Sequence, residues 1–192
     1  MTYPSPAGES WGEIREKGSR FLAWIGPAGG EDEARAALDR LTREYPDATH
    51  HCWAWRLGAP PRERSSDAGE PSGTAGMPIL QVLRGADLSD AMAVVIRWFG
   101  GTKLGKGGLA RAYAAAAREA LAGLPTVLRV PTVRVALEIP YEKVGAVKRL
   151  IHPPAVELES EEYGERARLT LAVQEERREE LREALADLGI VV

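Results

Sequence analysis

The chain has 192 residues, of which 44% are hydrophobic and 28% charged, and its formal net charge is -3. This is the composition of a soluble globular protein with one large or two small domains, and the negative charge argues against attraction of the whole surface to nucleic acid or membranes. A single cysteine excludes an internal disulfide and favours a reducing compartment. No apolar leader or long apolar run is present, so we expect a cytoplasmic protein without a membrane span.

The first two thirds of the chain alternate expected strands and helices. A short apolar strand is expected over Phe21–Ile25, followed by a helix over Glu31–Glu44 with apolar residues at helical spacing. Thr49–Leu57 is predicted as a strand, and residues 58–73, rich in Pro, Gly, Ser and charge, as a long mobile loop. The next elements are a helix, a strand and a helix, expected over Gly76–Leu83, Ala93–Phe99 and Leu109–Ala122.

A second module follows an expected linker, Gly123–Val130. Its elements are strand, helix, strand, strand, helix and strand, over 133–139, Tyr141–Ile151, Val156–Glu159, Arg166–Val173, Glu175–Leu188 and Ile190–Val192. The order β-α-β-β-α-β is typical of a ferredoxin-like unit. We therefore expect domains at 1–124 and 131–192. Basic and acidic side chains balance over residues 1–124, so the net charge of -3 lies in residues 125–192, which argues against a broad RNA-binding surface on the second domain.

The most informative stretch joins the expected strand at Ala93–Phe99 to the following helix. It is dense in glycine and lysine, and no Asp or Glu occurs from Ala91 to Arg118. Glycines let an anion approach the backbone N–H groups, and a helix opening at Gly107–Gly108 adds unpaired N–H groups and a positive dipole end. The expected ligands of an RNA phosphate are Arg97, Gly100, Gly101, Thr102, Lys103, Gly105, Lys106, Gly107, Gly108 and Arg111.

The stretch matches parts of two nucleotide-binding motifs but lacks residues that each of them requires. The spacing Gly100-x-x-x-x-Gly105-Lys106 copies much of a phosphate-binding loop, but Gly107 replaces the Ser or Thr that would hold magnesium. The dinucleotide fingerprint fails because the turn is too long and no acidic strand end follows. A purely structural crossover with solvated lysines remains an open alternative.

The same stretch resembles the signature of the Impact family, in its bacterial YigZ-like branch. Further matching segments occur in order over most of residues 19–125, namely Ser19–Ala23, Ala48–Arg56 and Ser66–Ile79, beside Arg97–Gly105 and Gly107–Tyr113. The resemblance implies an α+β protein, with an N-terminal module like domain 2 of ribosomal protein S5 and a ferredoxin-like C-terminal module. It also implies that eukaryotic members regulate translation through protein partners, whereas the bacterial branch has no settled activity.

An acidic, glycine-containing loop is the second candidate feature. We expect a cleft lined by His50, Asp67, Glu70, Ser72, Gly73 and Thr74. Ser72 and Thr74 either cap the helix starting near Gly76 or bind phosphate beside Lys103 and Lys106. Ala68 stands where the family commonly has a second acidic residue, which argues against a metal site.

His50 and Cys52, in the expected strand Thr49–Leu57, have different expected roles. His50 is either a packed structural residue or an acid/base group. Cys52 is expected as a small buried hydrophobe, since a histidine two residues away on a strand is poorly placed to activate it.

We therefore expect a translation-associated binding or regulatory protein that contacts RNA, the ribosome or a protein of the translation machinery. No catalytic residue, metal or cofactor is assigned, no membrane partner is expected, and the oligomeric state is a monomer or weak homodimer. Two alternatives stay open. One is an enzyme acting on a small phosphorylated substrate with His50 as acid/base, and the other is a pure protein-interaction adaptor.

Overall fold

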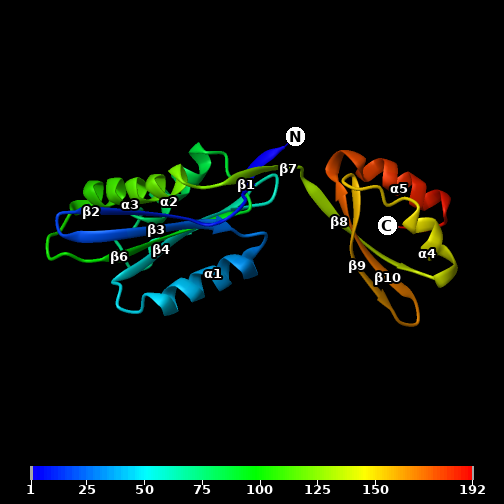
Figure 1. Cartoon of the computed structure of the whole chain (residues 1–192), viewed down its shortest axis with the longest axis horizontal. Coiled ribbons are helices and arrows are strands. Elements are labelled where there is room, and N and C mark those ends of the chain that lie inside the picture. The colour runs from blue at the N-terminus through cyan, green and yellow to red at the C-terminus, as the bar shows by residue number, and fades with distance from the viewer. Residues whose placement is uncertain (1, 192) are drawn as a thin grey trace. The chain divides into compact units, whose positions relative to one another are not determined.

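The computed structural model of the chain describes residues 2–191. Two compact units follow one another along the sequence, the larger formed by Thr2–Arg129 and the smaller beginning at Val130 (Figure 1). Each unit has its own sheet, helices and hydrophobic core. Strands and helices are mixed in both, and the strands pair antiparallel, so the expected α+β class is confirmed. Within residues 2–191, no helix is both long and apolar enough to cross a membrane.

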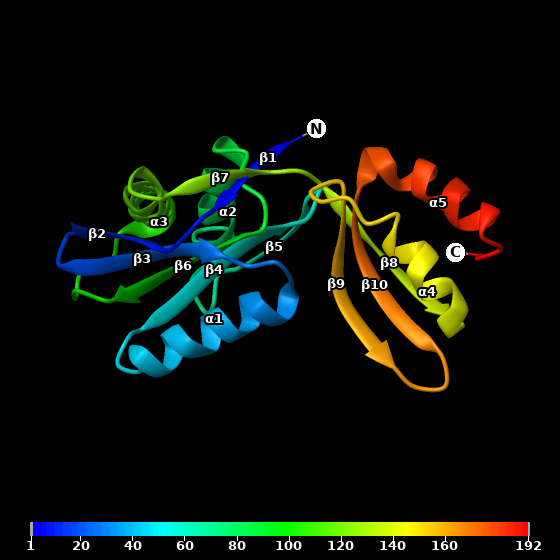
Figure 2. The ribbon, with the colours of Figure 1, turned by 45° about the vertical axis from the view of Figure 1, so that its right-hand side comes forward.

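The larger unit is built on a five-stranded antiparallel sheet. In spatial order its strands are β2 (Ser10–Glu16), β3 (Ser19–Pro27), β6 (Ala91–Trp98), β4 (His50–Leu57) and β5 (Arg62–Ser66). Helices α2 (Gly76–Gly85) and α3 (Gly105–Ala122) pack on one face, and α1 (Glu31–Glu44) packs on the other (Figure 2). The central strand β6 is buried along its first seven residues because both of its faces are covered.

The side chains of β3 alternate between the two faces of the sheet, so this one strand contributes to two hydrophobic clusters. Phe21 and Ile25 pack toward α2 and α3, whereas Leu22 and Trp24 pack toward α1. Successive side chains of a strand point to opposite faces of the sheet, so an unbroken apolar run is required where both faces are covered. The run Phe21–Ile25 meets that requirement.

Four strands of this unit are not predicted from the sequence. β1 (Tyr3–Pro6) pairs with β7 (Thr126–Arg129), where a linker is expected. β2 lies at one edge of the main sheet, and β5 lies at the other, inside the region 58–73 expected as a loop. The residues of β2, β5 and β7 are mostly exposed or half-buried. Hydrophobic periodicity cannot reveal such strands, since edge strands keep polar residues facing solvent.

The start of α3 also differs from the expectation. The helix begins at Gly105, four residues before Leu109, where its apolar periodicity begins. Glycine has a low helix propensity, so helix propensity does not predict this glycine-rich first turn. The exposed backbone of this turn is nevertheless helical, and it belongs to the candidate anion-binding segment.

The smaller unit has a three-stranded antiparallel sheet and two helices. In spatial order its strands are β8 (Thr132–Ile139), β10 (Ala167–Gln174) and β9 (Val156–Tyr163). The helices are α4 (Tyr141–Lys148) and α5 (Arg178–Asp187), the latter preceded by a short 3-10 turn, η1 (Glu175–Arg177). Insertion of β10 between β8 and β9 gives the split β-α-β arrangement of ferredoxin-like modules.

The expected last strand, Ile190–Val192, is not formed by the residues that the structure describes. Gly189 has a φ of +67° and ends α5, while the Ile190 N–H donates to the Leu185 carbonyl at 2.9 Å. This is the hydrogen-bond pattern of a glycine-terminated helix, and it turns Ile190 back into the core. Val191 belongs to no strand, and Val192 lies outside the described residues. The module is therefore observed as β-α-β-β-α.

Gly12 offers a test of the packing of β2 on α3. A Cβ at Gly12 would lie 2.3 Å from the Ala120 backbone nitrogen, so the helix and the strand must separate to accept it. We expect Gly12→Ala to lower the free energy of unfolding by about 2–4 kcal/mol, as overpacking against a backbone does. Urea denaturation measures this. The matched control is Gly85→Ala, where nothing lies within 4 Å of the added Cβ and no loss is expected.

Candidate functional site

A buried ion pair lies at the end of β6. Arg97 follows Ala93 and Val95 along the row of β6 that faces α2 and α3, so the strand directs its side chain inward. Its Nη1 donates to Oε1 of Glu70 at 2.5 Å, and the two side chains are only 6% and 4% exposed. Arg97 is expected among the phosphate ligands, but its charge is instead compensated inside the protein by Glu70.

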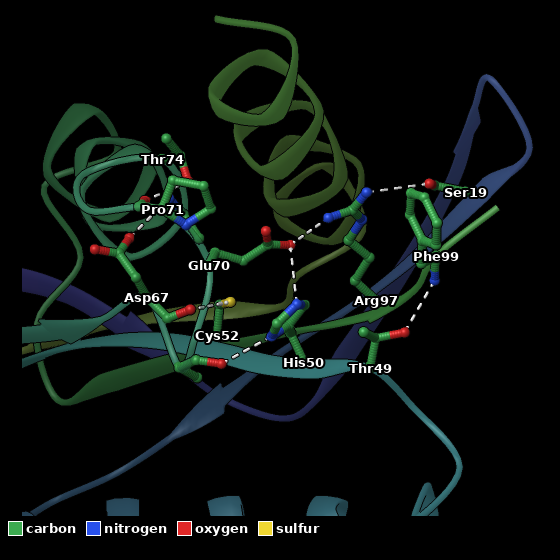
Figure 3. Close-up of polar contacts among 12 residues, drawn as sticks. Ser19, Thr49, His50, Cys52, Asp67, Glu70, Pro71, Thr74, Arg97 and Phe99 are labelled. Atoms are coloured by element: carbon green, nitrogen blue, oxygen red, sulfur yellow. Dashed lines mark hydrogen bonds and ion pairs between the residues drawn. The ribbon is translucent and has the colours of Figure 1, made fainter. Parts of the chain in front are cut away.

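Glu70 is the common acceptor of a wider polar network, and Figure 3 shows its contacts with Arg97 and His50. Its Oε1 also accepts the hydroxyl of Tyr113 from α3 at 2.7 Å. The Cys52 thiol lies 3.3 Å from that hydroxyl and 3.0 Å from the Asp67 carbonyl oxygen. Burial raises the pKa of Tyr113 well above its ordinary value, with Cys52 and Glu70 adding to the shift. The phenol therefore remains a proton donor to Glu70.

The loop between β5 and α2 presents Glu70 to Arg97. The Asp67 carboxylate accepts backbone N–H groups from Gly73 at 2.8 Å and from Ala75 and Gly76 at 2.9 Å each. Burial alone would raise the pKa of Asp67, but these three donors bring it below its usual value. Asp67 therefore satisfies the start of α2, a role expected of Ser72 and Thr74. The Thr74 hydroxyl is buried and donates to Pro71, whereas Ser72 is exposed.

His50 lies at the edge of this network. Its Nδ1 is 2.9 Å from the Ala68 carbonyl oxygen, which requires a proton on Nδ1. The other ring nitrogen, Nε2, lies 3.9 Å from Oε1 of Glu70. The His50 side chain is 20% exposed, so the imidazole that faces the buried carboxylate is in part open to solvent. Gly69 has a φ of +90° and passes close to the imidazole, where an added Cβ would lie 3.3 Å from Nδ1.

The glycine loop, Gly100–Gly108, follows β6, and its first residue is held in place by β3 and the turn before it. The Gly100 N–H donates to the Ser19 hydroxyl at 3.1 Å, and the same hydroxyl accepts Nη2 of Arg97 at 3.3 Å. A Cβ at Gly100 would lie 1.9 Å from the Gly18 backbone, so only glycine fits there. Gly101 and Gly105 have φ values of +87° and +71°. Three of the loop glycines thus have a structural reason that requires no ligand.

The basic side chains of this loop face solvent without partners among the described residues. Lys103, Lys106 and Arg111 are exposed, and none of them takes part in a hydrogen bond or ion pair within residues 2–191. The first turn of α3 holds no acidic residue and no side-chain cap. A Cβ at Gly107 would lie 3.3 Å from Nη1 of Arg111, so this guanidinium reaches back over the first turn. Uncompensated cations and open N–H groups are thus combined at one helix start.

The other candidate residues lie in the glycine loop or in the buried network around Glu70. Gly100, Gly101, Thr102, Gly105 and Gly107 are exposed in the glycine loop, and Gly108 is half-buried. Among residues 2–191, no three His, Cys, Asp or Glu side chains lie together as metal ligands. Cys52 contacts a tyrosine and a carbonyl rather than a base, so no activated nucleophile is formed.

The comparison with protein families agrees with this architecture. The Impact N-terminal domain matches residues 17–121, which is more than half of the chain. The chain belongs to the IMPACT family. The IMPACT match includes β3 to α3, and therefore both the buried network and the glycine loop. A domain of unknown function, DUF1949, matches residues 137–189 of the smaller unit. The predicted family and the two-module organisation are confirmed.

Several IMPACT relatives cover most of this chain. An IMPACT family member of Haemophilus influenzae is 36% identical over 162 residues, covering 83% of this chain and 79% of the relative. One of Thermus thermophilus is 42% identical over 153 residues, covering 80% and 83% respectively. A crystal structure described as that of a hypothetical protein aligns with a TM-score of 0.77 at 31% identity, over 100% of this chain and 97% of the other.

Some residues of the buried network are not identified from the sequence as site residues. Tyr113 and Ser19 stand in segments that resemble the IMPACT family, but their roles arise from partners 43 and 78 residues away. A buried tyrosine with a required hydrogen-bond partner is a general signal for such networks. No local spacing indicates which carboxylate that partner is.

Removal of the Glu70 charge tests the buried ion pair. Glu70→Gln keeps the side-chain size but leaves the Arg97 guanidinium buried without a counter-charge. We expect a loss of about 3–5 kcal/mol in the free energy of unfolding, measured with guanidinium chloride. The control is Glu13→Gln, which disrupts the surface pair with Arg20 and is expected to cost at most about 1 kcal/mol. Equal stability of Glu70→Gln and wild type would contradict the structural role assigned to this pair.

The Cys52 thiol provides a pH test of the same network. Burial raises the pKa of Cys52 to about 12, so iodoacetamide at about pH 8 is expected to leave the folded protein unmodified and to alkylate the unfolded chain. The unfolded thiol ionises near pH 9 and the folded thiol does not. Its contribution to stability is therefore complete below about pH 9 and is lost as the pH rises toward 12. The stability difference between wild type and Cys52→Ala should shrink over this range.

Proposed function

We propose that this IMPACT family member is a translation-associated binding protein that holds RNA phosphate at the start of α3. The observation that carries the proposal is the gathering of Lys103, Lys106 and Arg111 around a helix start with open N–H groups. Phosphate oxygens suit this combination, because cations and N–H donors are supplied together and no carboxylate of the same segment competes.

The contrast with other cations of the larger unit supports this assignment. Arg20 lies 2.9 Å from Glu13, and Arg84 lies 2.5 Å from Glu63, so these guanidinium groups are already compensated. Binding of a phosphate by an uncompensated cation releases counterions from the RNA without first breaking an internal pair. The attachment of Gly100 to Ser19 fixes the beginning of the loop, which lowers the cost of ordering it on a ligand.

Family membership is what supports a setting in translation. The resemblance implies translational regulators among eukaryotic members, and ribosomal RNA offers a dense array of phosphates. Basic and acidic side chains balance in residues 1–124, so the proposed attraction is confined to the loop. A few phosphate contacts at one place would position the protein on RNA, whereas a broadly basic surface would bind RNA non-specifically.

A second candidate is an enzyme acting on a small phosphorylated substrate. The observation in its favour is that His50 uses Nδ1 to hold the Ala68 carbonyl oxygen and leaves Nε2 facing Glu70, on a side chain that is 20% exposed. A neutral imidazole in that tautomer can accept a proton at Nε2. Thermal denaturation with nucleotides and sugar phosphates separates this candidate from RNA binding. A ligand at 100 times its Kd would add about 2.7 kcal/mol of stability.

The proposed RNA contact predicts a salt-dependent affinity that depends on three side chains. We expect the wild type to bind ribosomes and a short RNA hairpin. Lys103→Ala/Lys106→Ala/Arg111→Ala should lose about 2–3 units of the slope of log K against log salt, since each phosphate contact contributes about 0.7–0.9. Fluorescence anisotropy across a salt series measures both the affinity and the slope.

The matched control removes three exposed cations from α1 and β5, as Arg35→Ala/Arg43→Ala/Arg64→Ala. The proposal requires this control to keep the wild-type slope. Equal losses in the two triple variants would show non-specific attraction and contradict a local grip. Absence of binding by the wild type would exclude RNA as the ligand, and a discrete protein captured without RNA would favour the adaptor alternative.

A further inference from the structure

The two outer strands of the smaller sheet differ in how they are protected. β8 and β9 are both edge strands, because β10 lies between them. β9 carries four glutamates among its eight residues, so a second chain approaching with the same sequence would be repelled. β8 has a single acidic residue, Glu138, and a single basic one, Arg134, and no proline within its length. Its edge is therefore open over Thr132–Ile139 and carries both signs of charge.

The space beside β8 is partly apolar. A groove of about 380 Å³ lies between β8 and α5, with Val133, Val135, Leu181 and Leu185 among its lining residues. A complete ferredoxin-like module has a fourth strand, and among residues 2–191 no strand pairs with the outer edge of β8. Unpaired N–H and C=O groups beside an apolar groove form a template for another strand.

We propose that β8 pairs antiparallel with β8 of a second copy of this chain, about a twofold axis through Ala136. In that register Arg134 lies opposite the partner's Glu138, and Glu138 lies opposite the partner's Arg134. On the core-facing side, Val135 lies opposite the partner's Leu137, and Val133 opposite the partner's Ile139. Both faces of the strand are therefore self-complementary, as an isologous twofold interface requires.

Other antiparallel registers of the same strand lose this complementarity. A shift of one residue places Arg134 opposite an apolar, core-facing residue and turns the apolar row of the partner to solvent. A shift of two residues places Arg134 opposite Ala136 or Pro140 and removes both charge pairs. Among these registers, the one centred on Ala136 alone keeps the two opposite-charge pairs and the four apolar pairs. Pro131 and Pro140 flank β8, which confines the pairing to the eight residues between them.

The charges already present on the exposed face extend across the proposed interface. Arg134 reaches Glu159 on β9 at 2.7 Å, and Arg168 on β10 lies 3.4 Å from Glu138. Pairing would place these in continuous rows of alternating sign across six strands. Because only one strand and one groove contribute, the interface is small, and we expect a dissociation constant of about 10 μM to 1 mM.

Charge reversal on the full chain tests the proposal by analytical ultracentrifugation over protein concentrations up to about 1 mM. The wild type should show a concentration-dependent monomer–dimer equilibrium. Arg134→Glu alone and Glu138→Arg alone should each weaken the dimer at least about tenfold, because each places like charges opposite each other at both ends. The double variant should dimerise as the wild type does, and an equimolar mixture of the two single variants should form the heterodimer. Arg166→Glu, in the turn between β9 and β10, changes the net charge by the same amount as Arg134→Glu and should leave the equilibrium unchanged.

A crosslink tests the register independently. Residues directly opposite each other on antiparallel strands have Cα atoms about 4.5–5.5 Å apart, which a disulfide can bridge. Ala136→Cys should therefore give a covalent dimer on mild oxidation, with the buried Cys52 as the other thiol of the chain. Thr170→Cys, placed opposite Ala136 on the neighbouring strand β10, should give no covalent dimer.

Three outcomes would overturn the proposal. A wild type that stays monomeric up to about 1 mM contradicts it directly. Dimers that survive both single charge reversals would use another surface, and failure of the single variants to associate when mixed would exclude the register centred on Ala136. None of these outcomes depends on RNA binding, so the test stands apart from that of the proposed function.

Discussion

The ion pair between Arg97 and Glu70 holds together the segments on which the candidate site depends. Through Glu70 it joins β6 to the loop between β5 and α2, and through Tyr113 it joins both to α3. The guanidinium also bonds to Ser19, at the start of β3. Two charges removed from water gain little net stability unless their geometry is well satisfied. The pair is therefore best understood as fixing where the loop and the helix lie on the sheet.

One hydroxyl connects this buried network to the exposed glycine loop. Ser19 accepts both Nη2 of Arg97 and the N–H of Gly100, the first glycine after β6. The larger unit thus separates two kinds of positive charge. Arg97 is compensated and serves the fold, whereas Lys103 and Lys106 begin a few residues later and remain open to solvent. The close approach of Gly100 to Gly18 keeps the transition between them short.

The sequence predicts the elements whose apolar residues recur at the spacing of a helix or strand, and it misses the short strands that lack this pattern. The helix Glu31–Glu44 has its predicted bounds because apolar spacing and an acidic first turn coincide there. Strand Tyr3–Pro6 is missed because its partner strand lies far along the chain and its two buried residues are Ser5 and Pro6, which give no apolar alternation. The glycine density is visible in the sequence, but the reason for Gly100 is not, since its neighbour Gly18 is brought close by tertiary structure alone. The same holds for Tyr113, whose partner Glu70 is 43 residues away.

The pairing of β1 with β7 has a mechanical consequence. Tyr3 lies opposite Arg129, so the chain enters and leaves the larger unit at the same end of this two-stranded sheet. A force applied between the N-terminal residues and the smaller unit would load the bonds of this sheet one after another, as a zipper opens, rather than all together in shear. The Tyr3 hydroxyl, held 2.6 Å from Asp90, would take the strain early. The β1–β7 sheet, with four residues in each strand, would therefore yield under tension before the five-stranded sheet is loaded.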